Sequence, residues 1–131
     1  MAVTFEELFN HKSEIRDCEL LTYEAGKIVV GTRVNESNCN PYGTAHGGYL
    51  FTLCDNTAGL LGYSLGHYVV TMNSSISFLK SVRSGVKLTV AAETVHDGAS
   101  SKVCEVEIRD ENGSLVCKAM FTLFPVKKIE E

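Results

Sequence analysis

The chain has 131 residues and a mass of 14.3 kDa, which suffices for one domain with one hydrophobic core. A formal net charge of −4 and a pI near 5.6, without any long basic run, argue against a nucleic-acid-binding protein. No apolar stretch is long enough to span a membrane, and the N-terminus lacks the basic and apolar parts of a signal peptide. We therefore expect a single domain over residues 1–131, located in the cytoplasm.

Cysteine usage favours the same compartment. The chain has five cysteines, an odd number, and no CxxC spacing. They are Cys18, Cys39, Cys54, Cys104 and Cys117. We expect free thiols in a reducing environment and no metal site, because no two cysteines or histidines stand at ligand spacing.

Capping and periodicity predict the first elements. A capping box at Thr4–Glu7 predicts a short N-terminal helix over about residues 4–11. Alternation over residues 27–34 predicts a strand. The segment from about 47 to 65 is the one long helix candidate, because apolar side chains recur there at steps of three and four. These residues are Leu50, Leu53, Cys54, Thr57, Ala58, Leu61 and Leu65.

From Tyr68 onward the apolar period changes to two, which predicts four more strands. They cover approximately residues 68–79, 86–93, 103–109 and 115–123. Three glycine-containing pairs predict hairpin turns between them, namely Ser84–Gly85, Asp97–Gly98 and Asn112–Gly113. Residues 126–131 are interpreted as a solvated tail. A helix that is apolar nearly all round must be wrapped, so we expect an α+β fold in which a curved antiparallel sheet of five to six strands surrounds one central helix.

One carboxylate is isolated in an otherwise uncharged region. From Ser37 to Leu79, Asp55 is the one side chain with a formal charge. An ionised carboxylate in such surroundings is costly unless it is paired, hydrogen-bonded or neutralised. Asp55 is therefore the first candidate for a catalytic residue, although a buried aspartate that caps a neighbouring loop is the alternative.

The glycine pair before Asp55 is the second candidate. Gly47 and Gly48 at a helix start expose backbone N–H groups, which suit an oxyanion or a polarised carbonyl. Asp55 follows Gly47 by eight residues, so it lies roughly 12 Å further along the helix. Both groups cannot reach one reacting carbonyl within a single helix. Either they serve different purposes, or each active site takes them from two chains.

Two motifs carry a resemblance to a known family. They are Asn40-x-x-Gly43-x-x-His46-Gly47-Gly48, and Leu53-x-Asp55 followed by Ala58-Gly59. Together they resemble the hotdog-fold acyl-CoA thioesterases, specifically the phenylacetate-pathway type, and the resemblance extends from about Lys27 to Pro125. It implies a sheet around a central helix, edge-to-edge homodimers with active sites at the interface, and a dimer of dimers.

The resemblance also implies roles for individual residues. Asp55 would be the general base or the nucleophile that attacks the thioester, and Gly47 would donate its N–H to the thioester oxygen. Asn40 would position the water or the thioester from the opposite chain. His46 would orient the Gly-Gly turn, although a purely structural histidine is the alternative.

A hydroxyl residue in the strand after the helix often helps to hold the water in that family. Thr71 fits this position, with Asn73 and Ser74 as alternatives. Lys80 and Arg83 end the uncharged region where CoA phosphates would reach the surface, and an ordinary solvated turn is the alternative interpretation.

Several residues are expected to line the substrate pocket. Gly48 would lie beside the thioester, and Tyr49, Phe51 and Phe78 would line an acyl pocket, unless these aromatic side chains only fill the core.

The sequence thus predicts an acyl-CoA thioesterase that releases free acid and CoA without a metal or redox cofactor. Two other functions compete with it: a non-catalytic acyl-CoA-binding module on the same fold, and a hotdog hydratase or dehydratase. A hydratase would pair a histidine with an acidic residue, whereas His46 lies about 13 Å from Asp55 along the helix axis. The acyl group itself is not identified by the sequence.

Overall fold

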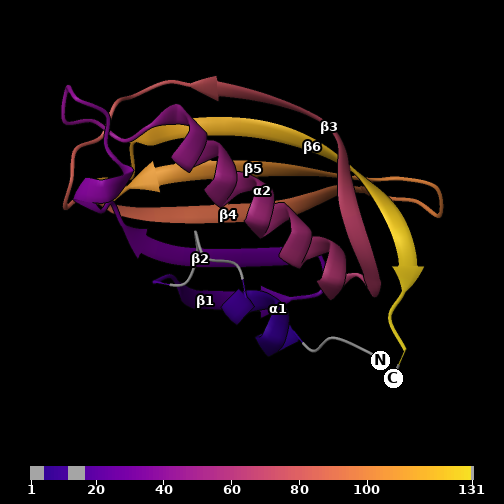
Figure 1. The fold of residues 1–131 in the computed structure, drawn as a ribbon. Helices are drawn as coiled ribbons and strands as arrows, with labels where there is room; N and C mark the ends of the chain where they lie inside the picture. Colours follow the sequence, from indigo (N-terminus) through magenta and orange to yellow (C-terminus); the bar gives the residue numbers. More distant parts are fainter. Residues whose placement is uncertain (1–4, 12–16, 131) are drawn as a thin grey trace.

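The computed structural model describes residues 5–11 and 17–130 (Figure 1). Its elements are α1 (Phe5–His11), β1 (Glu19–Glu24), β2 (Lys27–Arg33), the 3-10 helix η2 (Glu36–Asn38), α2 (Gly47–Ser64), β3 (His67–Phe78), β4 (Lys87–Asp97), β5 (Lys102–Asp110) and β6 (Leu115–Lys128). The N-terminal helix and the long helix lie where the sequence predicts them. Thr4, the first residue of the expected capping box, lies outside the described residues.

The six strands form one antiparallel sheet in the order β1-β2-β4-β5-β6-β3. Figure 1 shows the sheet curving around α2, with β3 and β6 bending sharply past the end of the helix. The predicted α+β class and the wrapped central helix are confirmed. Strand β1 is the one that the sequence did not locate.

The core lies between α2 and the concave face of the sheet. Leu53, Ala58 and Leu61 of α2 are fully buried against inward-facing side chains such as Val90 and Phe121. At the C-terminal end of the helix, β3 approaches closely at Gly62. A Cβ atom built on Gly62 would lie 2.4 Å from Val69 Cγ2, so only glycine allows this contact.

Two predictions about the strands are wrong. Ser84–Gly85 is not a hairpin turn, because β3 pairs with β6 and not with β4, so the chain crosses the end of the sheet between them. The two residues do turn the chain, since Gly85 has φ +91°, but turn chemistry does not determine which strands pair. The expected tail at residues 126–131 is also partly strand, because β6 continues to Lys128, opposite His67.

Candidate active site

Asp55 lies on the flank of α2 that faces β3, and it is half-buried. Thr71 Oγ1 donates a hydrogen bond of 2.5 Å to Asp55 Oδ1. This hydrogen bond fixes the orientation of the carboxylate. The isolated carboxylate of the sequence therefore has one neutral hydrogen-bond donor from the neighbouring strand.

A β-bulge explains why Thr71 reaches the helix. Thr71 pairs with Leu123, but Asn73 pairs with Thr122, so Met72 is an extra residue in β3. The bulge changes which residues of β3 face inward, because side chains alternate along a strand. Of the three hydroxyl or amide candidates, Thr71 is the one that contacts Asp55.

The start of α2 carries a second group of candidate residues. Gly47 and Gly48 are exposed, and a Cβ atom on Gly47 would lie 3.3 Å from Phe78 Cζ, whereas one on Gly48 would have nothing within 4 Å. The ring of Phe78 thus lies beside the backbone of Gly47. The predicted oxyanion donor and one predicted acyl-pocket residue are neighbours.

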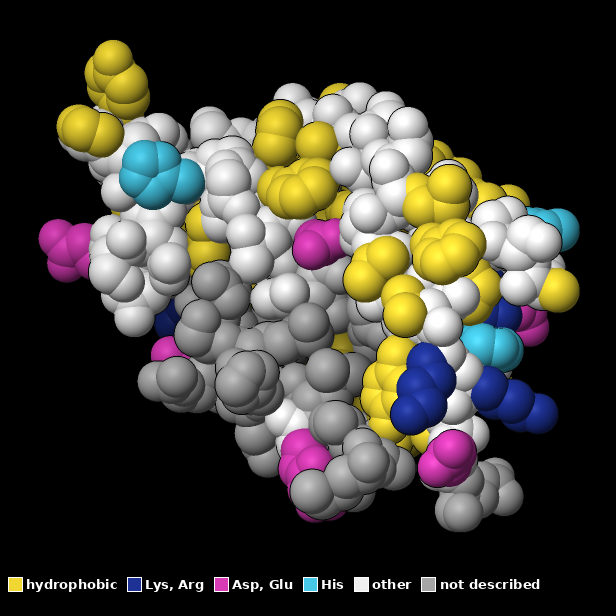
Figure 2. Space-filling view, turned by 45° about the vertical axis from the view of Figure 1, so that its right-hand side comes forward, with side chains coloured by type: hydrophobic (Ala, Val, Ile, Leu, Met, Phe, Trp, Pro, Cys, Tyr) yellow, Lys and Arg dark blue, Asp and Glu magenta, His cyan; other side chains and the backbone are white. Residues whose placement is uncertain are grey.

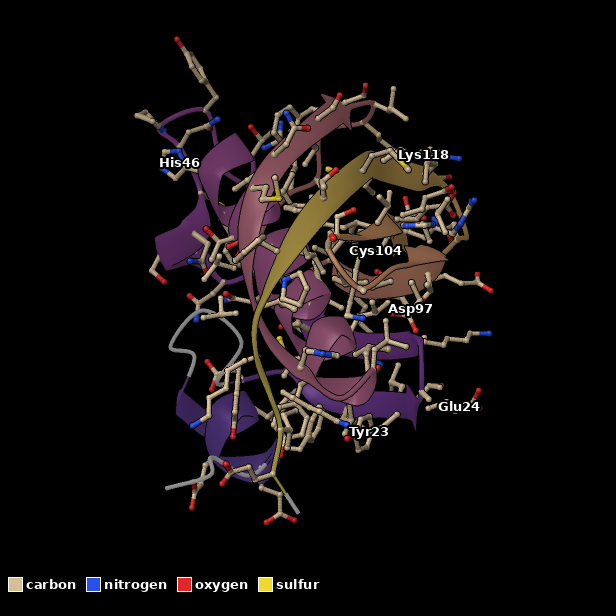
Figure 3. All side chains as sticks on the ribbon, turned by 90° about the vertical axis from the view of Figure 1, so that its right-hand side faces the viewer. Tyr23, Glu24, His46, Asp97, Cys104 and Lys118 are labelled. Carbon is tan, nitrogen blue, oxygen red and sulfur yellow. The ribbon has the colours of Figure 1, made fainter. Side chains whose placement is uncertain are left out.

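His46 is the N-cap residue of α2, and Figure 3 places it at the start of this helix. Its side chain is exposed and makes no capping hydrogen bond. Its backbone N–H donates to Asn38 O at 2.9 Å, and its carbonyl accepts from Leu50 N at 3.1 Å. The backbone of His46, rather than its imidazole, connects the helix start to the preceding loop.

The side chain of Asn40 holds that loop in shape. Asn40 Oδ1 accepts hydrogen bonds from the N–H of Tyr42 at 3.0 Å and of Thr44 at 3.1 Å, while Nδ2 donates to Thr44 Oγ1 at 3.0 Å. Gly43 has φ +85°, which permits the tight turn. Within one chain, Asn40 therefore organises the loop that leads into Gly47.

One chain does not bring the two groups together. Helix α2 is continuous from Gly47 to Ser64, so the rise of about 1.5 Å per residue places Asp55 roughly 12 Å from Gly47 along the axis. We call the pair Asp55 and Thr71 the carboxylate half-site, and the pair Gly47 and Phe78 the glycine half-site. They lie at two separate places along α2 and β3.

The other aromatic candidates lie elsewhere. Tyr49 lines a cavity of about 610 Å³ together with Thr32 and Asn35, and burial raises the pKa of its phenol. Phe51 packs in the core with its ring centroid 5.6 Å from that of Phe121. Of the three predicted acyl-pocket residues, Phe78 is the one that contacts a predicted catalytic residue.

Lys80 and Arg83 differ in their surroundings. Lys80 Nζ forms an ion pair of 2.5 Å with Asp110 Oδ2. The lysine, and then the N–H groups of Ser114 and Asn112, lower the pKa of Asp110 below its ordinary value. The sequence did not single out Asp110, which is 30 positions from Lys80, although the turn that it begins is a recognisable signal.

Arg83 is exposed beside the loop that precedes Gly47. Its Nη1 lies 3.1 Å from the position of a Cβ built on Gly43, and its backbone forms a bridge with Thr44. The guanidinium group is therefore near the glycine half-site, whereas the ammonium group of Lys80 is engaged by Asp110.

Cys54 precedes Asp55 but is not a candidate nucleophile. The side chain is fully buried, and burial, with smaller contributions from Cys117 and Asp55, strongly raises the pKa of its thiol. A thiolate, not a thiol, is the reactive form. Within residues 5–11 and 17–130, no cluster of three or more His, Cys, Asp or Glu residues is placed to hold a metal ion. No helix in this described part is long and apolar enough to cross a membrane.

Comparison with known proteins identifies the family. The profile of the thioesterase superfamily matches residues 42–117, more than half of the chain. The 1,4-dihydroxy-2-naphthoyl-CoA hydrolase of Listeria monocytogenes is 31% identical over 113 residues, which cover 84% of this chain and 91% of that protein.

Solved structures of related proteins are also similar to this chain. A hypothetical thioesterase protein with coenzyme A from Streptococcus pneumoniae has 41% identity and a TM-score of 0.92, over 97% of this chain and all of that one. A Streptococcus mutans protein bound to acetyl CoA has 41% identity and a TM-score of 0.85, over 86% and 91% of the two chains.

Two further structures of the pneumococcal protein carry alanine in place of an aspartate and of a threonine. Each has 44% identity and a TM-score of 0.83, over 85% of this chain and 92% or 91% of the other. The family match and these likenesses confirm the predicted hotdog-fold thioesterase. The chain therefore belongs to the thioesterase superfamily and is a thioester hydrolase.

Proposed function

We propose that the chain hydrolyses acyl-CoA thioesters to free acid and CoA, with Asp55 as the general base or the nucleophile. The observation that carries this proposal is the hydrogen bond from Thr71 to Asp55, which supports the one formal charge between Ser37 and Leu79. Because Thr71 occupies Oδ1, Oδ2 remains available to a water molecule or to the thioester carbon.

Hydrolysis of the thioester can proceed with Asp55 in either role. As a base, Asp55 removes a proton from water while a new C–O bond forms at the thioester carbon. As a nucleophile, it forms that bond itself, and water cleaves the resulting anhydride. In both cases the C–S bond breaks, and the CoA thiolate leaves and takes up a proton.

Gly47 is proposed to stabilise the negative charge that develops on the thioester oxygen. Its N–H belongs to the first turn of an 18-residue helix, where the helix supplies no acceptor and the dipole favours an anion. Its exposure leaves access for a carbonyl oxygen. The adjacent ring of Phe78 would contact the acyl group next to that carbonyl.

We propose a homodimer in which each active site takes the carboxylate half-site from one chain and the glycine half-site from the other. The separation of roughly 12 Å along α2 supports this, because catalytic groups must reach one carbonyl within hydrogen-bond range. In this arrangement Asn40 acts from the opposite chain by holding the loop before Gly47.

The relatives support a CoA substrate. One solved relative holds coenzyme A, another holds acetyl CoA, and the Listeria relative is named for a CoA thioester. The two residues changed to alanine in the pneumococcal protein are 16 positions apart, the same spacing as Asp55 and Thr71. Arg83, exposed beside the glycine half-site, is proposed to contact the CoA phosphates.

The test is a panel of acyl-CoA and acyl-carrier-protein thioesters, with released CoA or carrier thiol measured by chromatography. The wild-type chain should release CoA, and Asp55→Asn should lose a factor of about 10² or more in kcat. Glu24→Gln, which changes an exposed carboxylate of β1, should retain full activity. Wild-type rates for Asp55→Asn would contradict the role of Asp55. Binding without release would favour a non-catalytic module, and hydration of an enoyl-CoA without release would favour a hydratase.

A further inference from the structure

The first turn of α2 has few contacts of its own that could hold the N–H of Gly47 in place. Gly47 and Gly48 have no side chains, and glycine weakens a helix relative to alanine. The N-cap residue, His46, makes no side-chain capping hydrogen bond, and its carbonyl accepts from Leu50 N at 3.1 Å. A helix that starts this way is expected to fray, so another contact must fix its first turn.

Charged side chains do not supply this contact, because the first turn of α2 has none. Asp55, the one formal charge from Ser37 to Leu79, lies about two turns further along the helix. Figure 2 shows that charged side chains lie mainly toward the rim of this face of the molecule, while uncharged ones cover most of its middle. The start of α2 therefore depends on apolar packing and on neutral hydrogen bonds.

Apolar packing holds one flank of the first turn and leaves the other hollow. Leu50 is 4% exposed and belongs to the core. Tyr49, about 100° away around the helix axis, faces the cavity of about 610 Å³ between α2, β2 and the loop that contains Asn35 and Asn38. Val34 is the one aliphatic residue among the described residues that line this cavity. On this flank, a hydrogen bond has to do what packing does on the other.

The phenol of Tyr49 makes that hydrogen bond. Tyr49 shares a side-chain hydrogen bond with Thr32 of β2, and Thr32 shares another with Cys18, next to β1. Burial raises the pKa of the Tyr49 phenol, so the phenol stays protonated and can donate. We call the hydrogen bond between Tyr49 and Thr32 the hydroxyl link. It connects the first turn of α2 to the sheet beside the cavity.

We infer that Tyr49 is a positioning residue for hydrolysis, because the hydroxyl link fixes the first turn of α2 so that the N–H of Gly47 faces the thioester oxygen. This inference rests on the role proposed above for Gly47, and it gives Tyr49 a task other than lining an acyl pocket. Tyr49 follows Gly47 by two positions, about 200° around the axis. The hydroxyl link therefore acts on the side of the helix opposite to the ring of Phe78, which lies beside Gly47.

The first test is hydrolysis of the acyl-CoA that the wild-type chain cleaves fastest. Tyr49→Phe keeps the ring but removes the hydroxyl group, so kcat should fall about 2- to 10-fold, the effect of one neutral hydrogen bond. KM should not change, because a contact made in the transition state alone lowers kcat without changing KM. Tyr23→Phe is the matched control, since it removes a phenol hydroxyl from β1, and it should retain full activity.

Thr32 tests the same link from its other end. Thr32→Val keeps the shape of the side chain and should lower kcat as much as Tyr49→Phe, whereas Thr32→Ser keeps the hydroxyl group and should recover most of the rate. The double variant with Tyr49→Phe and Thr32→Val should be no slower than either single variant, because both remove one interaction. Fully additive losses would overturn the inference.

The second test follows the first turn itself and does not depend on catalysis. The N–H of Leu50, which donates to His46 O, should exchange with solvent about 2- to 10-fold faster in Tyr49→Phe, measured by NMR. The N–H of Leu61, nearer the other end of α2, should exchange as in wild type. Unchanged exchange at Leu50 would overturn the inference.

The two tests together separate this inference from its rivals. A lower kcat with unchanged KM and faster exchange at Leu50 supports it. A change in KM that grows with the length of the acyl chain would place Tyr49 in the acyl pocket and overturn it, and so would faster exchange at Leu50 with wild-type kcat. If the wild-type chain releases no CoA, the proposed function fails. Faster exchange at Leu50 would then still support the hydroxyl link.

Discussion

The two half-sites are built on the same helix and the same strand but by different means. The carboxylate half-site depends on side chains, because Thr71 Oγ1 donates to Asp55 Oδ1 at 2.5 Å. The glycine half-site depends on backbone, because Gly47 has no side chain, its N–H lies in the first turn of α2, and a Cβ atom built on it would lie 3.3 Å from Phe78 Cζ. A single side-chain substitution therefore removes the carboxylate half-site directly. The same kind of substitution alters the glycine half-site only by changing the shape of its backbone.

The supports of the two half-sites differ in the same way. Val69 packing on Gly62 brings β3 against α2 near Thr71. The glycine half-site is held by polar contacts, with Asn40 in its loop and the ion pair between Lys80 and Asp110 just after Phe78. Apolar packing of the strand on the helix therefore supports the carboxylate half-site, whereas hydrogen bonds and an ion pair support the glycine half-site.

The largest effect is expected when the two half-sites are inactivated in separate variants and the two variants are then combined in one dimer. Asp55→Ala and Asn40→Ala homodimers should each lose most activity, by a factor of about 10² for Asp55. When the two are unfolded and refolded together, a heterodimer carries both changes in one site and neither in the other. Activity should approach about a quarter of wild type when half the dimers are mixed.

Each variant refolded alone is the control for this experiment and should stay inactive. If mass spectrometry detects heterodimers but activity does not return, Asn40 and Asp55 act within one chain, and the comparison between two separate half-sites fails.

Thr71→Val sharpens the comparison on the carboxylate side. Loss of a hydrogen bond to a charged group is worth about 1.5–3 kcal/mol, which corresponds to a decrease in kcat of about 10- to 100-fold. Thr71→Ser keeps the hydroxyl and should recover most of the rate. Stability should change little, because Thr71 is exposed. Equal kcat for Thr71→Val and wild type would show that the hydrogen bond does not support catalysis.

Arg83→Ala tests whether the arginine beside the glycine half-site contacts the CoA phosphates. An exposed ion pair is worth about 1 kcal/mol or less, so KM for acyl-CoA should rise about fivefold at most, with kcat unchanged. Lys80→Ala is the matched control and should leave KM unchanged, because its ammonium group pairs with Asp110. An acyl-pantetheine substrate, which lacks the nucleotide phosphates, should show no effect of either change. A larger KM effect for Lys80 than for Arg83 would reverse this assignment.

The smallest expected effect concerns the ion pair between Lys80 and Asp110, which lies just after Phe78. Because the pKa of Asp110 is lowered in the folded chain, its contribution to stability is present above the ordinary aspartate pKa of about 3.9 and is lost as pH falls below it. The difference in unfolding free energy between wild type and Asp110→Asn should therefore shrink from pH 6 to pH 3. Urea unfolding at several pH values measures it, and a difference that is constant with pH would contradict the ionised pair.

The sequence by itself determined the features that depend on neighbouring residues. Apolar residues at steps of three and four predicted the long helix, which α2 confirms from Gly47 to Ser64. The charge at Asp55 stood out because the cost of isolating a carboxylate is visible in composition alone. The glycine pair marked the helix start in the sequence alone, and the combined motif predicted the family.

Only the tertiary structure decided what depends on strand register and on contacts between distant segments. Thr71 could not be separated from Asn73 and Ser74 until the pairing with β6 placed the bulge at Met72. The turn at Ser84–Gly85 became a crossover once β3 paired with β6, and the ion pair between Lys80 and Asp110 could be seen only once the two segments lay side by side. Register is set by packing across the whole sheet, and a one-residue shift turns every side chain to the other face.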